Sequence, residues 1–222
     1  MALNGEVVVT PDVTGAFAQQ VLEAFRSRPQ DHFALALTGS DDARDCYTRL
    51  AADAGSHIDW WKVDVYWADE RCVPHDHEHS NYRMAREALL DQVGAAHATH
   101  LMRCAEGPDP YQLRLGDLGG LDLVHLGLGP DGHTASLVPG DPVLEVRSDP
   151  VALTGLYQGY RRLTMTYPVL DAAGARVWWV ESAAPGQAKA QAASALLAGD
   201  RSVPAGWVER AETTVVIDAG DG

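Results

Sequence analysis

Short apolar runs alternate with segments of helical periodicity along most of the chain. The run EVVVT (6–10) predicts a strand, and apolar residues then recur at helical spacing from Val13 to Phe25. The same alternation predicts further strands at 32–38, 62–68, 121–129, 162–170 (interrupted at Pro168), 176–182 and 213–218, and helices at 12–27, 43–51, 80–93 and 186–199. This order is typical of βαβ units. We therefore expect an α/β fold with a mostly parallel sheet, helices on both faces, and a single domain over residues 1–222.

The residues that follow the strands are the candidates for a ligand site. Ligands of open parallel sheets bind beyond the carboxyl ends of the strands. The segments at these positions are TGS (38–40), ADERCVP (68–74), GPDGHT (129–134) and Tyr167–Pro168.

The loop GLGPDGHTAS (127–136) places His133 after three glycines. Glycines 127, 129 and 132 allow a positive φ and a close approach of the backbone to a ligand. We expect His133 to lie at or near a helix N-terminus, where the dipole keeps the imidazole neutral and able to take a proton from water. The alternative is a loop histidine without a chemical role. The glycines do not distinguish between these two roles of His133, because their spacing differs from the dinucleotide-binding fingerprint and indicates no particular ligand.

Other positions offer groups for a phosphate. Arg71 could bind one through two parallel hydrogen bonds, held by an acidic neighbour, or it could belong to a solvated run of charges. Gly39 and Ser40 could point backbone N–H groups at a phosphate, or Ser40 or Asp41 could only cap the next helix. Lys189, on the last predicted helix, is by itself an ordinary surface lysine.

The formal net charge of −14 limits the partners of the chain. A field of this sign is unfavourable for nucleic acid and for an anionic membrane. No apolar run approaches the ~20 residues that a transmembrane helix needs. A small anionic substrate would need a local group of Arg, Lys and backbone N–H, because salt damps the repulsion only beyond about 8 Å. We therefore expect a small cationic pocket in an acidic protein.

The N-terminus and the cysteines favour a cytoplasmic location. The segment MALNGEVVVTPDV has neither the basic region nor the apolar core of a signal peptide. Cys46, Cys72 and Cys104 are odd in number and far apart, so we expect reduced thiols rather than disulfides. The alternating histidines of HDHEH (75–79) lie in a loop that we expect to be exposed and to lack a further ligand. We expect no metal site there.

Five segments, taken in order, resemble the 6-phosphogluconolactonase family. They are YWADERCVP, SNYRMAREALL, LDLVHLGLGPDGHTASLVPG, RLTMTYPVLDAA and APGQAKAQAASALL, and the resemblance runs over roughly residues 5–218. It implies a Rossmann-like fold of the glucosamine-6-phosphate deaminase type. It also implies hydrolysis of 6-phospho-D-glucono-1,5-lactone to 6-phosphogluconate, the second step of the oxidative pentose phosphate pathway, without a metal or organic cofactor. The sugar-phosphate lactone is then the expected partner, and we expect a monomer.

This chemistry is an attack of water on an ester carbonyl, which needs a base, donors for the oxyanion and a site for the phosphate. We expect His133 to be the base and Asp131 to orient its loop. Arg71 and the N–H groups between Gly129 and Gly132 are the candidate oxyanion or phosphate donors. The other expected substrate contacts are Gly39, Ser40, Asp69, Lys189 and, as a weaker candidate, Arg162.

Two parts of the chain depart from the family's pattern. Its phosphate loop usually reads Ser-Gly-Gly-Ser-Thr-Pro, whereas residues 37–42 read LTGSDD, which loses a glycine and adds Asp41 and Asp42. We expect one of these carboxylates to cap the following helix rather than to repel a phosphate. The region between the strand expected at Leu101 and the strand at Leu121 also looks short for the family.

Two other functions stay open from the sequence. A sugar-phosphate isomerase or deaminase of the same superfamily would use Asp69 as its base. In the deaminases the histidine is typically followed by Ile-Ala-Phe-Asn-Glu-Pro, whereas here residues 134–139 read TASLVP, the lactonase form. A non-catalytic sugar-phosphate sensor is the other alternative, although the chain has no spare basic region for a DNA-binding segment.

Overall fold

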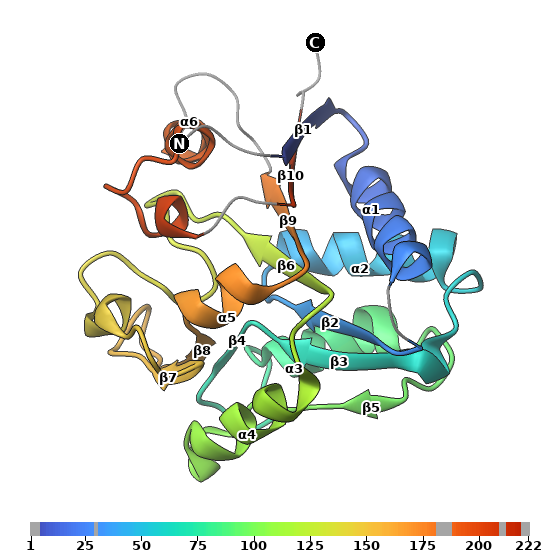
Figure 1. Cartoon of the computed structure of the whole chain (residues 1–222), viewed down its shortest axis with the longest axis horizontal. Helices are drawn as coiled ribbons and strands as arrows, with labels where there is room; N and C mark the ends of the chain where they lie inside the picture. Colours follow the sequence, from blue (N-terminus) through green and yellow to red (C-terminus); the bar gives the residue numbers. More distant parts are fainter. Residues whose placement is uncertain (1–4, 29–30, 181–187, 209–211, 219–222) are drawn as a thin grey trace.

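The computed structural model describes residues 5–28, 31–180, 188–208 and 212–218, and its centre is a sheet of seven parallel strands (Figure 1). In order across the sheet these are β1 (Gly5–Thr10), β10 (Thr213–Asp218), β9 (Ala175–Val180), β6 (Leu123–Gly127), β2 (Phe33–Leu37), β3 (Val63–Trp67) and β5 (Ala98–Thr99). Every residue of β2 is buried, as expected for a parallel strand that is covered on both faces. The predicted parallel sheet is confirmed.

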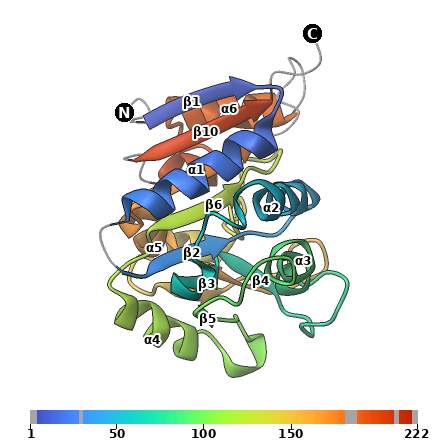
Figure 2. The ribbon, with the colours of Figure 1, turned by 90° about the vertical axis from the view of Figure 1, so that its right-hand side faces the viewer.

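Helices cover both faces of this sheet (Figure 2). The first layer contains α1 (Val13–Ser27), α2 (Asp41–Ala54) and α3 (Asn81–Ala85), and the second contains α4 (Asp109–Leu118), α5 (Tyr167–Ala172) and α6 (Ala188–Ala198). Alternation along β2 separates the two cores, because Phe33 and Leu35 pack with the first layer and Ala34 and Ala36 with the second. In the described part of the chain, no helix is both long and apolar enough to cross a bilayer.

A small antiparallel sheet begins where β3 ends. Its strands are β4 (Asp69–Arg71), β8 (Arg162–Met165) and β7 (Val151–Leu153), in that order. Only Ala68 separates β4 from β3, so the small sheet continues directly from the carboxyl edge of the large one. The register places Arg71 opposite Arg162 and Asp69 opposite Thr164. Two arginines that are distant in sequence therefore lie side by side.

Three elements differ from the sequence prediction. The helix α4 is not predicted, because it buries only Tyr111 and Leu115 and its apolar stripe is weak. No strand includes Leu101, since β5 is confined to Ala98–Thr99. The interruption at Pro168 is the start of α5, where the N–H that proline lacks is not needed. The ends of two predicted elements, 181–182 and 186–187, lie outside the described residues.

The expectation that all three cysteines are reduced is wrong. Cys72 and Cys104 form a disulfide with Cα atoms 5.3 Å apart, although 32 positions separate them in sequence. The spacing of the cysteines in sequence does not predict this disulfide. The two residues come together only because the segment after β4 lies next to a short 3₁₀ helix at Cys104–Glu106. A cross-link over a loop of this length contributes about 3–4 kcal/mol to stability by restricting the unfolded chain. Cys46 is buried on α2 and takes no part in the bond.

The strand β6 carries a histidine in the core. His125 is 1% exposed, its Nδ1 lies 3.0 Å from Tyr47 Oη, and its ring packs on Phe17 with centroids 4.2 Å apart. Burial lowers the pKa of His125 to about 3, because the charged imidazolium is disfavoured away from water. His125 is therefore neutral near pH 7.

This burial predicts an acid-dependent loss of stability. In the unfolded chain His125 takes up a proton near pH 6.5, whereas in the folded protein its pKa is about 3, so the unfolded state binds the extra proton first as the pH falls. Between pH 6.5 and pH 5 this difference should lower the free energy of unfolding by about 1.6 kcal/mol. His125→Asn, whose amide oxygen can replace Nδ1, should show a shallower loss in urea unfolding over this interval. Equal pH slopes in the two proteins would contradict the assignment.

Candidate active site

A cavity of about 380 Å³ opens at the carboxyl ends of β2, β3 and β6. Its wall includes the start of α2, parts of β4 and β8, and the loop after β6. Eight of the predicted site residues line it, namely Gly39, Ser40, Asp69, Arg71, Gly129, His133, Arg162 and Lys189. The other two, Asp131 and Gly132, belong to the loop that contains Gly129 and His133 but do not line the cavity. The structure thus brings together most of the residues that the sequence places at separate strand ends.

His133 faces this cavity as one half of an imidazole–carboxylate pair. Its Nδ1 lies 2.5 Å from Asp131 Oδ1, and its backbone N–H donates to the same oxygen at 3.2 Å. Because an ionised carboxylate can only accept, Nδ1 carries the proton in either charge state of the ring, and in the neutral imidazole Nε2 has a free lone pair. Nε2 is therefore the atom that can remove a proton from water.

Asp131 is kept ionised by this contact. Burial alone would raise the pKa of Asp131, but the charge of His133 and the hydrogen bonds from it outweigh burial, so the pKa is lowered. The phenol of Tyr157 donates a further bond to Asp131 Oδ2 at 3.3 Å. Tyr157, Asp131 and His133 form one hydrogen-bonded line that ends at the cavity.

No helix begins at His133, so the expectation that a helix dipole keeps it neutral is wrong. Residues 134–137 form a tight turn instead. Ser136 points inward and donates to Asp69 Oδ2 at 2.6 Å, and Thr134 donates to the last carbonyl of β6 at 3.0 Å. These bonds to distant partners hold the turn in place of a helical one.

Two glycines of this loop are needed for different reasons. A Cβ on Gly129 would lie 2.1 Å from His133 Nδ1, so this glycine makes room for the imidazole. Gly132 has a φ of 78° and a Cβ there would collide with Val203, so it shapes the turn. The N–H of Gly129 donates to the His133 carbonyl at 2.9 Å, and that of Gly132 to the Gly129 carbonyl at 3.0 Å. Because both N–H groups are used within the loop, side chains are the better candidates for oxyanion donors.

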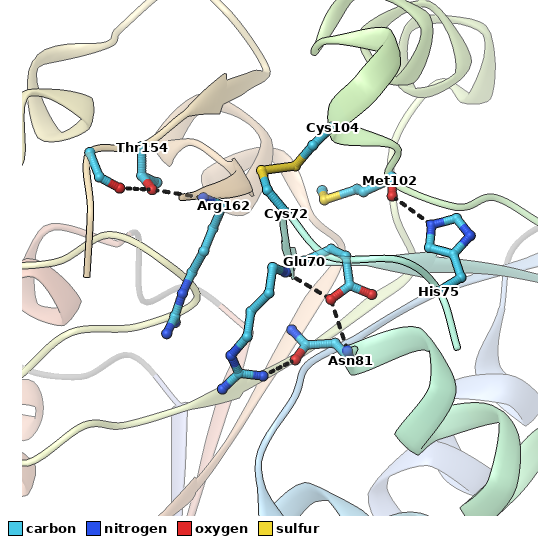
Figure 3. Close-up of a disulfide and its surroundings, with 10 residues drawn as sticks. Glu70, Cys72, His75, Asn81, Met102, Cys104, Thr154 and Arg162 are labelled. Carbon is cyan, nitrogen blue, oxygen red and sulfur yellow. Dashed lines mark hydrogen bonds between the residues drawn. A yellow bond between two sulfur atoms is a disulfide. The ribbon is translucent and has the colours of Figure 1, made fainter. Parts of the chain in front are cut away.

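Arg71 is positioned by Asn81, which lies beside Glu70 (Figure 3). The Nη1 of Arg71 donates to Asn81 Oδ1 at 2.7 Å and to the His79 carbonyl at 3.0 Å. Asn81 Nδ2 in turn donates to the Asp69 carbonyl at 2.9 Å, which fixes the orientation of the amide. A guanidinium has five N–H donors, so these two bonds leave donors in excess for a ligand.

Glu70 holds the backbone around Arg71 rather than its guanidinium. Its carboxylate, which is 2% exposed, accepts from the N–H groups of Arg71 at 2.7 Å, Asn81 at 2.8 Å and Tyr82 at 2.8 Å, and from the Ser80 hydroxyl at 3.0 Å. Burial raises the pKa of Glu70, and these bonds oppose the rise only in part. Strand β4 and the first turn of α3 are joined through this one side chain.

Arg162 is a buried cation at the cavity wall. It is 4% exposed, and burial lowers its pKa although the charge of Asp69 acts in the opposite direction. Its hydrogen bonds are long, at 3.5 Å to Ser136 Oγ and 3.4 Å to Gln158 Oε1, and its Nε has no partner among the described residues. A buried guanidinium with such weak bonds can still bind an anionic oxygen strongly. The structure therefore makes Arg162 a stronger candidate for substrate binding than the sequence does.

The tip of a hairpin supplies two residues that the sequence does not mark. Gln158 has a φ of 50° and Gly159 a φ of 83°, as in the type I′ turns that close hairpins. This turn directs Tyr157 towards Asp131 and Gln158 towards Arg162. A polar residue followed by glycine between two strands is a local sign of such a turn, but nothing in the sequence indicates its partners.

The start of α2 forms another part of the wall. Ser40 is the N-cap and accepts from the Ala43 N–H at 3.0 Å. The expectation that Asp41 or Asp42 caps this helix is wrong, because Ser40 already occupies that position and both aspartates belong to the first turn. Asp42 forms an ion pair with Lys189 Nζ at 2.9 Å, which places α6 beside the start of α2.

The cavity is less negative than the rest of the molecule. Its wall contains four cations and four acids, namely Arg44, Arg71, Arg162 and Lys189, and Asp41, Asp42, Asp69 and Glu78. The chain as a whole has a formal charge of −14. Two of the acids also have partners, since Asp42 pairs with Lys189 and Asp69 accepts from Ser136. The expected cations are therefore present, but an equal number of acids accompanies them, so the cavity is formally neutral rather than cationic.

Comparison with known proteins gives a consistent result. The family described as glucosamine-6-phosphate isomerases/6-phosphogluconolactonase matches residues 8–217. A 6-phosphogluconolactonase of Nostoc sp. is 34% identical over 236 aligned positions, which cover 97% of this chain and 96% of that protein. One of Synechocystis sp. is 40% identical over 164 residues, which cover 67% of this chain and 66% of that protein. The solved 6-phosphogluconolactonase of Thermotoga maritima has the same fold, with a TM-score of 0.82, 22% identity, and coverage of 96% of this chain and 99% of that one.

Substitution of Gly39 should test how Asn81 is held. A Cβ on Gly39 would lie 2.0 Å from the Asn81 amide, so Gly39→Ala must displace the side chain that positions Arg71. Such overpacking should lower the free energy of unfolding by about 1–3 kcal/mol. In an Asn81→Ala background the same change meets no amide, and its additional cost should fall below about 0.5 kcal/mol.

Urea unfolding of the four proteins in this double-mutant cycle provides the measurement. Gly127→Ala is the matched control, because a Cβ there meets nothing within 4 Å. An equal cost of Gly39→Ala in both backgrounds would show that Asn81 is not the group it displaces.

Proposed function

The chain belongs to the glucosamine-6-phosphate isomerase/6-phosphogluconolactonase family, and we propose that it hydrolyses 6-phospho-D-glucono-1,5-lactone to 6-phosphogluconate, the second step of the oxidative pentose phosphate pathway. The observation that carries this proposal is the Asp131–His133 pair beside a cavity that contains Arg71, Arg162 and Lys189. Hydrolysis of a phosphorylated lactone requires a base whose proton position is fixed, together with cations for the carbonyl oxygen and the phosphate.

Water attacks C1 of the lactone while His133 Nε2 accepts one of its protons. The imidazolium that forms lies against the Asp131 carboxylate, whose charge stabilises it. The bond between C1 and the ring oxygen then breaks, and the imidazolium returns its proton to that oxygen, which becomes the hydroxyl on C5. The carboxylic acid product ionises, and His133 is restored.

We assign the C1 oxygen to Arg162. The contacts of Arg162 with Gln158 and Tyr157, and of Tyr157 with Asp131, connect this guanidinium to the base. Its lack of a strong protein partner leaves it able to bind the oxyanion as the charge develops. Arg71, opposite it in the small sheet, extends the positive region towards Asn81 and Gly39.

We assign the phosphate to the start of α2. The backbone N–H groups at Gly39 and Ser40 and the positive end of this 14-residue helix favour an anion there. Lys189 lies at the same place through its pair with Asp42. The phosphate then faces a mixed site, in which one carboxylate competes with it for the lysine.

An isomerase or deaminase would need Asp69 as the base. Asp69 is 4% exposed, and its carboxylate accepts from Ser136 Oγ at 2.6 Å and from Asn81 Nδ2 at 3.4 Å. Both oxygens are thus directed to neighbouring side chains. Among the described residues, His133 Nε2 has no such hydrogen bond, and this difference favours lactone hydrolysis over enolisation.

The proposal includes a monomer with a single domain over residues 1–222. It includes no metal or organic cofactor, since a lactone is already an activated ester. It includes a cytoplasmic location, because a phosphorylated sugar is too highly charged to cross a bilayer unaided.

The purified protein should hydrolyse freshly prepared 6-phosphogluconolactone well above the spontaneous rate in a pH-stat assay. His133→Ala should lower kcat by about 10²–10⁴-fold with little change in KM, the range for a lost general base. Asp131→Asn removes the acceptor for Nδ1–H and should lower kcat by a similar factor, because the other tautomer becomes accessible.

His57→Ala, an exposed histidine on another surface, is the matched control and should keep the wild-type rate. Near-normal kcat in His133→Ala would remove this residue from the mechanism. Release of ammonia from glucosamine 6-phosphate, without lactone hydrolysis, would identify a deaminase instead.

The ion pair at α2 predicts opposite effects for its two members. Lys189→Ala should raise KM for the phosphorylated lactone by about 10-fold or more, the range for a hydrogen bond to a charged group. Asp42→Asn removes the competing carboxylate and should lower KM, most clearly at low salt. Neither change should alter kcat, and unphosphorylated gluconolactone should be indifferent to both. Equal effects on the two lactones would show that Lys189 does not bind the phosphate.

A further inference from the structure

Three histidines surround one aspartate at the amino end of the large sheet. Asp64, on β3, has its carboxylate oxygens 3.7 Å from His32 Nδ1, 2.9 Å from His97 Nδ1 and 3.6 Å from His100 Nε2. His32 precedes β2, and His97 and His100 flank β5. The cavity lies at the opposite, carboxyl end of these strands, so the proposed hydrolysis uses none of the four side chains.

We propose that His32, Asp64 and His97 form a binding site for a divalent transition metal ion of the zinc type, with His100 at its edge. Imidazole and carboxylate are ligands that Zn²⁺ commonly takes, and a water molecule can complete the coordination. Tetrahedral bonds of about 2.0–2.2 Å place ligand atoms about 3.3–3.5 Å from one another. The separations of His97 and His32 from Asp64, 2.9 and 3.7 Å, bracket this spacing. The ligand atoms of His32, Asp64 and His97 all lie within 4.8 Å of one another.

The strand register places two of the histidines on the face of Asp64. Asp64 is paired with Ala34 on β2 and with Ala98 on β5. His32 lies two positions before Ala34 and His100 two positions after Ala98, so the alternation of strands directs both to the face of Asp64. His97, one position before Ala98, is not placed by this alternation and reaches Asp64 from the segment that leads into β5.

Two of the histidines are also fixed by their backbones. The N–H of His97 donates to the Val63 carbonyl at 3.0 Å, and that of His100 to the Val65 carbonyl at 2.8 Å. The ring of His100 stacks on Tyr66 with centroids 4.3 Å apart. Ligands that are already held in place lose little conformational entropy when an ion binds.

The cluster is accessible from one side. The side chains of Asp64 and His100 are 13% and 20% exposed, whereas those of His32 and His97 are 48% and 50% exposed. An ion can enter from the solvent side and meet a sheltered carboxylate. The net charge of −14 raises the local concentration of cations at the surface.

The histidines of 75–79 do not form such a group. His75 Nε2 lies 3.1 Å from the Met102 carbonyl, and the rings of His77 and His79 contact Tyr160 (Figure 3 shows His75 beside Met102). Within the ranges that the structure describes, the group at Asp64 is the one with three such ligand atoms close enough to share an ion.

A bound ion would join β2, β3 and β5 at the edge of the sheet. The strand β5 has only two residues, so its attachment to the sheet is the one that a bound ion would strengthen most. The site is separated from the cavity by the length of a five-residue strand, roughly 16 Å. Metal binding should therefore stabilise the fold and leave hydrolysis unchanged.

Titration of the metal-free full chain with ZnCl₂, by calorimetry and by equilibrium dialysis, tests the proposal. We expect about one zinc ion per chain with a dissociation constant on the order of 1 µM or lower. A hundredfold excess over this constant should raise Tm by about 5 °C. His32→Ala with His97→Ala should abolish both effects, and circular dichroism should confirm that this variant is folded, since both side chains are half exposed.

His57→Ala and His133→Ala are the controls, because they remove an unrelated surface histidine and the base beside the cavity. Both should keep the zinc stoichiometry and the shift in Tm. Zinc binding that survives in the His32/His97 variant, or that disappears in His133→Ala, would place the ion elsewhere and overturn the proposal. The absence of binding in the wild type would overturn it as well.

Discussion

A carboxylate buried between β4 and α3 sets the geometry of the whole ligand-binding edge. Removing an ionised carboxylate from water costs several kcal/mol unless donors replace its hydration, and four donors converge on Glu70. Three of them are backbone N–H groups on two different elements, so strand and helix cannot move independently. Asn81 is fixed by this junction and fixes Arg71 in turn. The lack of a side chain at Gly39 is what allows Asn81 to lie there.

The large sheet could be predicted because hydrophobic periodicity repeats over many residues, and the ligand edge followed from the rule for parallel strands. The small sheet could not, because β4 and β7 have three residues each and show no usable alternation. The local sequence therefore gives no indication that Arg71 lies opposite Arg162. It gives none of the hydrogen bonds that Asn81 and Tyr157 form with distant residues. His133 shows the opposite case, in which local sequence favoured a helix and buried bonds of its neighbours imposed a turn.

The electrostatics of the cavity suit release as well as binding. Lys189 is shared with Asp42, and Arg162 lies near Asp69, so the two cations assigned to the phosphate and to the C1 oxygen each already face an acid. Hydrolysis converts a neutral lactone group into a carboxylate, and the product has one more negative charge than the substrate. In a chain with a formal charge of −14, this additional charge is repelled by the field of the whole molecule. The acidic surface thus opposes the product more than it opposes the substrate.

The disulfide turns residues 72–104 into a closed covalent ring, and the ring contains α3 and begins next to Arg71. When α3 separates from Glu70 in a local opening, the ring ties both ends of the segment to the exit of β4, which shortens the distance that Asn81 can move from its partners. A single proteolytic cut in the turn at 74–79 would open the ring without separating its pieces, so that the cleaved chain would still hold Asn81 beside Arg71.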